Sequence, residues 1–182
     1  GDQRFASLKE VKVDIRNNVA TVTFFRPNRG NAISSQMGDE VVQALNMCVY
    51  FQCPENISNI DQMSVENDPA VRVIVLTGVG KYFCTGMDLG AGNQGQMTKG
   101  LEQGIFILIL RFAYVVAKCT GNAAASAIKL YETVRQSKKP VVARINGPAM
   151  GGGWGLVFTA DVRIAHKDAW FWFAEVSSTK SK

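Results

Sequence analysis

The chain has 182 residues, of which 47% are hydrophobic and 19% charged, so it can form one domain with a substantial buried core. Its net charge of +5 is modest, and its basic residues are scattered rather than arranged in the stripe with interleaved aromatic residues that nucleic-acid binding needs. The longest apolar run, residues 105–116, is interrupted by Arg111 and falls short of the roughly 20 residues of a membrane-spanning helix, which argues against a membrane span.

The first part of the chain is predicted to form a β-hairpin followed by a helix. Apolar residues alternate along residues 11–15 and recur through residues 19–25, and the Asn17-Asn18 pair between them tolerates the positive φ of a two-residue turn. Residues 26–31 then break the second strand, and Ser34 or Ser35 can cap a helix. Apolar residues recur at helical spacing after that point, at Met37, Val41, Leu45 and Cys48.

The middle of the chain alternates between segments with and without a clear period. Residues 49–70 lose periodicity and are predicted to be a surface insertion. Residues 71–77 form a continuous apolar run, which is typical of a buried strand. Helical spacing returns at residues 101–116 and again at residues 127–134, and a further strand is expected at residues 141–145.

The last part of the chain is rich in glycine before it turns apolar again. Residues 146–155 contain a Gly triplet, and two short strands are expected near residues 162–165 and 169–173. Strands that alternate with helices predict an α/β fold. Because the sequence shows no repeat and no obvious linker, we expect a single domain over residues 1–182.

Two glycine-containing loops each follow a predicted buried strand. In one, a Gly triplet at residues 151–153 precedes a helix; in the other, Gly86 precedes Met87 and Asp88, which is placed to cap a helix. Backbone amides at such positions can approach a ligand oxygen without side-chain obstruction, and two of them can stabilise an enolate or oxyanion. The triplet alone would also suit close packing of a helix on a strand. Its spacing matches neither Gly-x-Gly-x-x-Gly nor a Walker A loop.

The motifs and their order resemble the crotonase (enoyl-CoA hydratase/isomerase) family. Arg26-Pro27 with Asn31-Ala32, residues 71–89, residues 139–153 and residues 160–165 are each similar to a family motif, and the resemblance extends over residues 11–176. It implies a crotonase-like ββα spiral that holds an acyl-CoA thioester, with CoA as part of the substrate and no separate cofactor. It also implies a homotrimer or a dimer of trimers if the family's C-terminal helices, which complete the trimer interface, are present.

The resemblance assigns roles to particular residues of this chain. The two oxyanion donors fall on the backbone amides of Met87 and Gly152. The proton-transferring carboxylate falls on Glu175. The substrate-binding residues that it implies, with Arg29 beside a CoA phosphate, are Arg29, Asn31, Ala32, Gly86, Asp88 and Gly151.

The chain departs from the family's hydratases in its carboxylates. Those hydratases resemble one another in using two Glu residues to activate and position water. The position of the first is Gly155 here, which can neither accept nor donate a proton, whereas the second matches Glu175. Hydration needs a water molecule held by two groups, but moving a double bond can use one base. An enoyl-CoA isomerase is therefore favoured. A hydratase, an acyl-CoA decarboxylase, a non-catalytic acyl-CoA-binding module, and an ordinary exposed Glu175 stay open as alternatives.

The remaining polar residues are given structural roles. The four cysteines contain no Cys-x-x-Cys pair and His166 is the sole histidine, so no metal site is expected and the thiols suit an intracellular protein. We expect Cys84 to pack in the core, His166 to lie at the surface, and Asp161 and Arg163 to support the fold. The family continues with C-terminal helices beyond the Glu175 motif, so the chain is expected to be incomplete there, the alternative being a degenerate relative that borrows cover from a partner. A mitochondrial or peroxisomal location is among the options.

Overall fold

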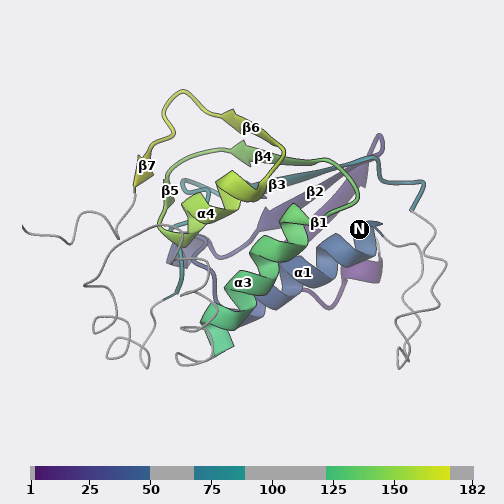
Figure 1. Cartoon of the computed structure of the whole chain (residues 1–182), viewed down its shortest axis with the longest axis horizontal. Helices are drawn as coiled ribbons and strands as arrows, with labels where there is room; N and C mark the ends of the chain where they lie inside the picture. Colours follow the sequence, from purple (N-terminus) through teal and green to yellow (C-terminus); the bar gives the residue numbers. More distant parts are fainter. Residues whose placement is uncertain (1–2, 50–67, 89–121, 173–182) are drawn as a thin grey trace, which may run out of the picture.

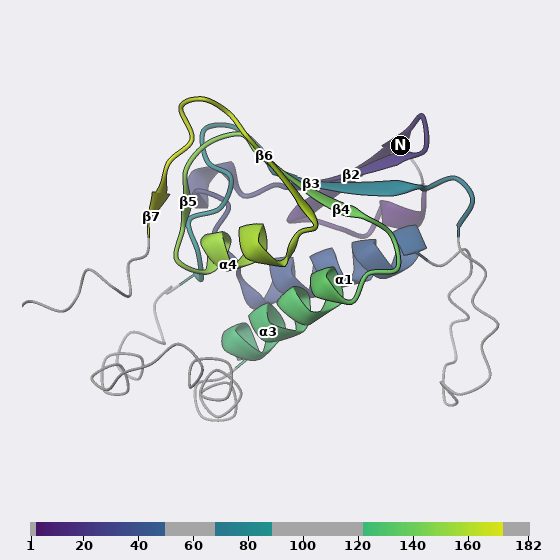
Figure 2. The same cartoon turned by 45° about the horizontal axis from the view of Figure 1, so that its top comes forward.

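The computed structural model describes residues 3–49, 68–88 and 122–172. A five-stranded sheet with the order β1-β2-β3-β4-β6 forms one layer, and helices α1 and α3 lie side by side against one of its faces (Figures 1 and 2). Two strands, β5 and β7, form a second small sheet. The elements are η1 Gln3–Phe5, β1 Val11–Arg16, β2 Val19–Phe24, η2 Pro27–Arg29, α1 Ser35–Val49, β3 Val73–Gly78, α3 Asn122–Arg135, β4 Val141–Ile145, β5 Ala149–Met150, α4 Gly152–Thr159, β6 Val162–Ala165 and β7 Phe171–Trp172.

The predicted hairpin is confirmed. Strands β1 and β2 pair antiparallel with Arg16 opposite Val19, and the two turn residues Asn17 and Asn18 have φ angles of 50° and 62°. Asparagine is one of the few residues that adopt this left-handed conformation readily, and the resulting turn twists in the same sense as the strands it joins. The local sequence therefore sets the register of the first strand pair.

The remaining strands build the spiral that the resemblance implies. Strands β2, β3, β4 and β6 pair parallel to one another in the main sheet. After each of the first three, the chain makes a short strand-like contact in a second layer: Ile33 bridges to Met87, Cys84 bridges to Ala149, and β5 pairs with β7. A helix follows β2, β3 and β4 in chain order, so a β–β–α unit recurs along the chain.

The core lies between the sheet and the two long helices. Helix α1 buries the apolar face that its spacing predicts, and the Ser34 hydroxyl accepts a hydrogen bond of 2.9 Å from the Met37 amide, which caps the helix. The helix predicted at residues 127–134 is confirmed as part of α3. The helix expected at 101–116 and most of the insertion expected at 49–70 lie outside the described residues, although α1 itself continues to Val49.

Helix α4 starts earlier than the sequence suggests. It begins at Gly152, inside the Gly triplet, with Gly151 as its N-cap and no side chain capping it. Beyond it, apolar side chains are exposed on α4, β6 and the segment that contains β7, namely Phe158, Val162, Ile164, Trp170, Phe171 and Trp172. No helix in the part of the chain that the structure describes is long and apolar enough to cross a membrane.

A buried ionic cluster joins the far end of α1 to the sheet. The Lys139 ammonium donates hydrogen bonds to the Cys48 carbonyl at 2.9 Å and to the Asp68 carbonyl at 2.7 Å, and the Asp68 carboxylate pairs with Arg4 at 2.8 Å. Burial favours the neutral form of Asp68, but hydrogen bonds from Arg4 and Ala70 and the charges of Arg4 and Lys139 outweigh it, and the pKa of Asp68 is lowered. The charged form is thus the one that the fold stabilises.

Replacing Asp68 by Asn should lower the free energy of unfolding at neutral pH by about 1–3 kcal/mol, because the half-buried Arg4 and the buried Lys139 lose a negative partner. A group with a lowered folded-state pKa stabilises the protein above its unfolded-state pKa and loses that effect as the pH falls through the folded-state value. The difference between wild type and variant should therefore shrink on acidification, as measured by urea unfolding at several pH values. Asp14→Asn, which removes an exposed pair with Arg16, is the control and should change little.

Candidate functional site

Three segments meet where β2, β3 and β4 end. The loop that follows β3 lies in the middle: its Gly86 carbonyl accepts a 2.7 Å hydrogen bond from the Ile33 amide, and its Asp88 amide donates one of 2.9 Å back to the Ile33 carbonyl. On the other side, the Met150 amide donates a 2.9 Å hydrogen bond to the Cys84 carbonyl. The two glycine-containing loops singled out in the sequence are therefore neighbours, joined backbone to backbone.

The amides of Met87 and Gly152 face the same place. Gly86 has a φ of 95°, a conformation that favours glycine, and a methyl group added to it would lie 2.8 Å from the Met150 carbonyl oxygen and 3.1 Å from the Gly152 nitrogen. A methyl group added to Gly152 would lie 3.4 Å from the Met87 nitrogen. Neither of these two N–H groups donates a hydrogen bond to any residue within the ranges that the structure describes. Two backbone donors are thus left available side by side.

The second of these amides stands at the start of a helix. Gly152 is the first residue of α4, so its N–H has no acceptor inside the helix. The aligned peptide dipoles add partial positive charge at this end. Gly151 has a φ of 48° and its amide donates a 2.9 Å hydrogen bond to the Trp172 carbonyl, which holds the entry to the helix against β7. The arrangement suits an acceptor oxygen that carries negative charge.

A sequence model of the enoyl-CoA hydratase/isomerase family matches residues 58–178, which is more than half of the chain. The chain belongs to the enoyl-CoA hydratase/isomerase (crotonase) family. The crotonase-like fold expected from the motifs is confirmed as well, because the chain is similar to a Legionella pneumophila structure classed as an enoyl-CoA hydratase/isomerase (crotonase), with a TM-score of 0.65 and 27% identity, covering 94% of this chain and 53% of that one.

The chain matches some relatives that are named as hydratases and others that are named as isomerases. It is 30% identical to the enoyl-CoA hydratase EchA19 of Mycobacterium tuberculosis over 163 residues, which are 90% of this chain and 48% of that protein. It is 34% identical to a peroxisomal Δ(3,5)-Δ(2,4)-dienoyl-CoA isomerase of Arabidopsis thaliana over 137 residues, which are 74% of this chain and 44% of that protein. The chain therefore spans about half the length of the curated relatives that it matches.

The crotonase-type turn around Asn31 is held together by that side chain. Asn31 is fully buried, its amide group donates hydrogen bonds to the carbonyls of Val79 at 3.0 Å and Tyr82 at 2.8 Å, and its side-chain oxygen accepts one of 3.0 Å from the Arg26 amide. Its φ of 56° is left-handed. The Asn31 side chain, expected from the family motif to bind substrate, is thus committed to joining two loops.

Arg26 ties the same turn to the loop that ends at Asp88. Its guanidinium pairs with Glu10 at 3.0 Å and with Asp88 at 2.8 Å, and it also donates a hydrogen bond to the Ala32 carbonyl. Asp88 accepts a second, longer contact of 3.3 Å from Arg29, whose side chain is 58% exposed. The helix that Asp88 was expected to cap lies outside the described residues, and its carboxylate pairs with two arginines. The sequence did not reveal Arg26 as the centre of this network.

Tyr131 is a side chain near the two amides that the sequence did not single out. It lies on α3, and its hydroxyl donates a 2.8 Å hydrogen bond to the Gly152 carbonyl. In the sequence it was one of several residues at helical spacing, and nothing in that spacing distinguishes a core position from a site position. Glu175, the expected proton carrier, lies outside the described residues.

The other polar residues behave as expected. Cys84 is fully buried, and burial raises the pKa of its thiol to about 12, so it is a neutral packing group at neutral pH. Asp161 accepts a 2.8 Å hydrogen bond from the Val141 amide, and Arg163 donates to three carbonyls at the end of α4, so both support the fold. His166 is exposed beside Asp168.

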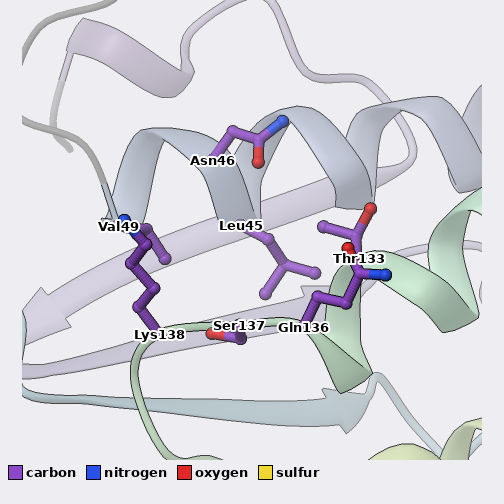
Figure 3. Close-up of a pocket in the computed structure, with 7 residues that line it drawn as sticks. All are labelled: Leu45, Asn46, Val49, Thr133, Gln136, Ser137 and Lys138. Atoms are coloured by element: carbon purple, nitrogen blue, oxygen red, sulfur yellow. The ribbon is translucent and has the colours of Figure 1, made fainter. Parts of the chain in front are cut away.

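A separate pocket of about 150 Å³ lies between the C-terminal ends of α1 and α3 (Figure 3). Its lining includes Ser137 and Lys138, which precede β4, whereas the Gly triplet follows the other end of that strand. The pocket is thus at the opposite end of the sheet from the two amides. Its lining residues are Leu45, Asn46, Val49, Thr133, Gln136, Ser137 and Lys138.

Replacing Arg26 by Gln should lower the free energy of unfolding by about 1–3 kcal/mol, because two partly buried carboxylates, Glu10 and Asp88, lose their shared cation. Arg29→Gln is the matched control: it removes an exposed guanidinium from the same Asp88 and should leave the stability nearly unchanged. Equal stability losses in the two variants, measured by chemical unfolding, would contradict the central role of Arg26.

Proposed function

We propose that the chain binds an acyl-CoA thioester with its carbonyl oxygen between the N–H groups of Met87 and Gly152. The observation that carries this proposal is the pair of adjacent backbone donors that the described part of the fold leaves without an acceptor. Both stand on loops fixed by backbone hydrogen bonds and by the Arg26 network. Donors that are already oriented stabilise a developing oxyanion without reorganisation, which is how such sites usually supply their largest rate effect.

The chemistry that this arrangement supports is the formation of an enolate. When the thioester oxygen accepts two hydrogen bonds, the C–H bond next to the carbonyl becomes more acidic, since the charge left by proton removal moves to that oxygen. We propose that Glu175 takes the proton from C2 of a 3-enoyl-CoA and returns it at C4, which shifts the double bond to C2–C3. The carboxylate ends the cycle as it began, and no other reactant is consumed.

The choice of isomerase over hydratase rests on Gly155. Adding water across a double bond needs a water molecule that is held and deprotonated, and position 155 carries no group for this task. The hydratase stands as the second candidate because one of the relatives named above is a hydratase. A CoA ester could contact the turn that contains Ala32, with the exposed Arg29 guanidinium near a phosphate. The homotrimer or dimer of trimers implied by the family stays a prediction for measurement in solution.

The oxyanion role of the Gly152 amide can be tested with two substitutions, of which only one removes the N–H. Gly152→Pro and Gly152→Ala both add a Cβ at the first position of α4, where proline is tolerated, but only the proline removes the N–H. We expect Gly152→Pro to turn over a CoA ester about 10²-fold more slowly than Gly152→Ala, with similar melting temperatures. A Gly152→Ala variant that is active and a Gly152→Pro variant with the same rate would rule out this amide as a donor.

The assignment of Glu175 predicts how activity divides among substrates. Wild type should convert a 3-enoyl-CoA to the 2-enoyl isomer faster than it hydrates a 2-enoyl-CoA, and Glu175→Gln should lose the isomerase activity by at least about 10²-fold while it still binds the ester. Coupled spectrophotometric assays and calorimetric titration measure the two quantities. Unchanged isomerisation by Glu175→Gln would remove the assigned base, and tight binding without any turnover would favour the non-catalytic alternative.

A further inference from the structure

The first turn of α4 has little stability of its own. Three of its eight residues are glycines, Gly152, Gly153 and Gly155, and glycine costs up to about 1 kcal/mol relative to alanine in a helix interior. The N-cap residue Gly151 offers no side chain to accept a hydrogen bond from the first turn. The turn that presents the Gly152 amide must therefore be held from outside the helix.

Tyr131 provides such an outside contact. Its hydroxyl donates a 2.8 Å hydrogen bond to the Gly152 carbonyl, which is part of the peptide group that follows the Gly152 N–H. Since α3 is a 14-residue helix packed against both α1 and α4, the phenol is carried on a more stable element than the one it contacts. The bond fixes the plane of the first peptide group in α4 relative to the body of the protein.

The ring of Tyr131 also occupies the space next to Gly155. A methyl group added at Gly155 would lie 3.3 Å from the ring carbon Cζ and 3.4 Å from the hydroxyl oxygen. One added at Gly152 would lie 2.7 Å from that hydroxyl oxygen, 3.3 Å from Cγ of Met87 and 3.4 Å from the Met87 nitrogen. The phenol thus spans the face of α4 between positions 152 and 155, beside the two donor amides.

We infer that Tyr131 is a positioning and specificity-determining residue of this site, an inference that rests on the proposed function. By anchoring the Gly152 carbonyl it restricts the rotation of residue 152, whose N–H faces the proposed place of the thioester oxygen. With its ring it fills the side of α4 from which a polar side chain at position 155 would reach the reacting carbons. The site therefore presents a phenol ring where a second water-holding group would have to stand, and this favours proton transfer over hydration.

The positioning role is tested with Tyr131→Phe, which removes the hydroxyl and keeps the ring. We expect kcat for the double-bond shift to fall about 5- to 10-fold with KM within about 2-fold, because the misdirected donor matters most in the transition state. Thr133→Val is the control, since it removes a hydroxyl that donates a 2.7 Å hydrogen bond within the same helix, away from α4. An unchanged kcat in Tyr131→Phe, or an equal fall in Thr133→Val, would overturn the positioning role.

The specificity role is tested with a double-mutant cycle at positions 131 and 155. Gly155→Glu in the wild-type background should lower the melting temperature and add no hydratase activity, because the new side chain meets the ring. Adding Tyr131→Ala should recover part of that loss and raise the ratio of hydration to isomerisation by at least about 10-fold. Additive changes in melting temperature would overturn the placement of the ring against position 155.

The two kinds of measurement separate failure of this inference from failure of the proposed function. Wild type that turns over neither 3-enoyl-CoA nor 2-enoyl-CoA would overturn the proposed function and the kinetic roles of Tyr131 together. Coupling in the melting temperatures does not depend on any substrate, so its absence would overturn the inference even in an active enzyme. Coupling together with an unchanged hydration ratio would overturn the specificity role alone.

Discussion

The close approach of two loops is the constraint on which the site depends. Gly153 lies so near Cys84 that a methyl group at position 153 would lie 2.2 Å from the Cys84 carbonyl oxygen, well inside the van der Waals contact distance. The backbone of one loop therefore packs directly on the backbone of the other, and the Met150 amide bonds to that same carbonyl. Because the loops are this close, the Met87 and Gly152 amides stand side by side without any side chain between them. The two adjacent donors exist because of that contact.

Charged groups secure both ends of the sheet around this contact. Arg26 joins the turn after β2 to the end of the Cys84–Asp88 loop, and its partners Glu10 and Asp88 are mostly buried. At the other end of the sheet, Lys139 joins α1 to the turn before β3 through hydrogen bonds to two backbone carbonyls. Buried ion pairs contribute little net stability compared with apolar packing, but they permit few alternative geometries. A site whose donors must stay aligned benefits from that restriction.

Sequence patterns predicted the parts of the structure that are determined by residues close together in the chain. The Asn17-Asn18 turn, the apolar face of α1 and the buried strand β3 follow from φ preferences and periodicity, and the glycines of the two loops follow from the need for close approach. The roles of Asn31 and Tyr131 depend on partners 48 to 51 and 21 residues away. No local pattern contains that information. The family motif marks Asn31, but it does not say that its side chain is committed to holding loops.

The contrast between the two candidate reactions comes down to what surrounds the shared amides. Two backbone donors polarise a thioester equally well for proton transfer and for water addition, so they cannot decide between the reactions. Which of the two reactions occurs depends on the groups that hold or exclude water. Among the described residues, the start of α4 has glycine at position 155 and the phenol of Tyr131 against it, with no carboxylate on that turn. Under the proposed function Glu175 then acts without a second carboxylate from that turn, and one carboxylate is sufficient to carry a proton from one carbon to another.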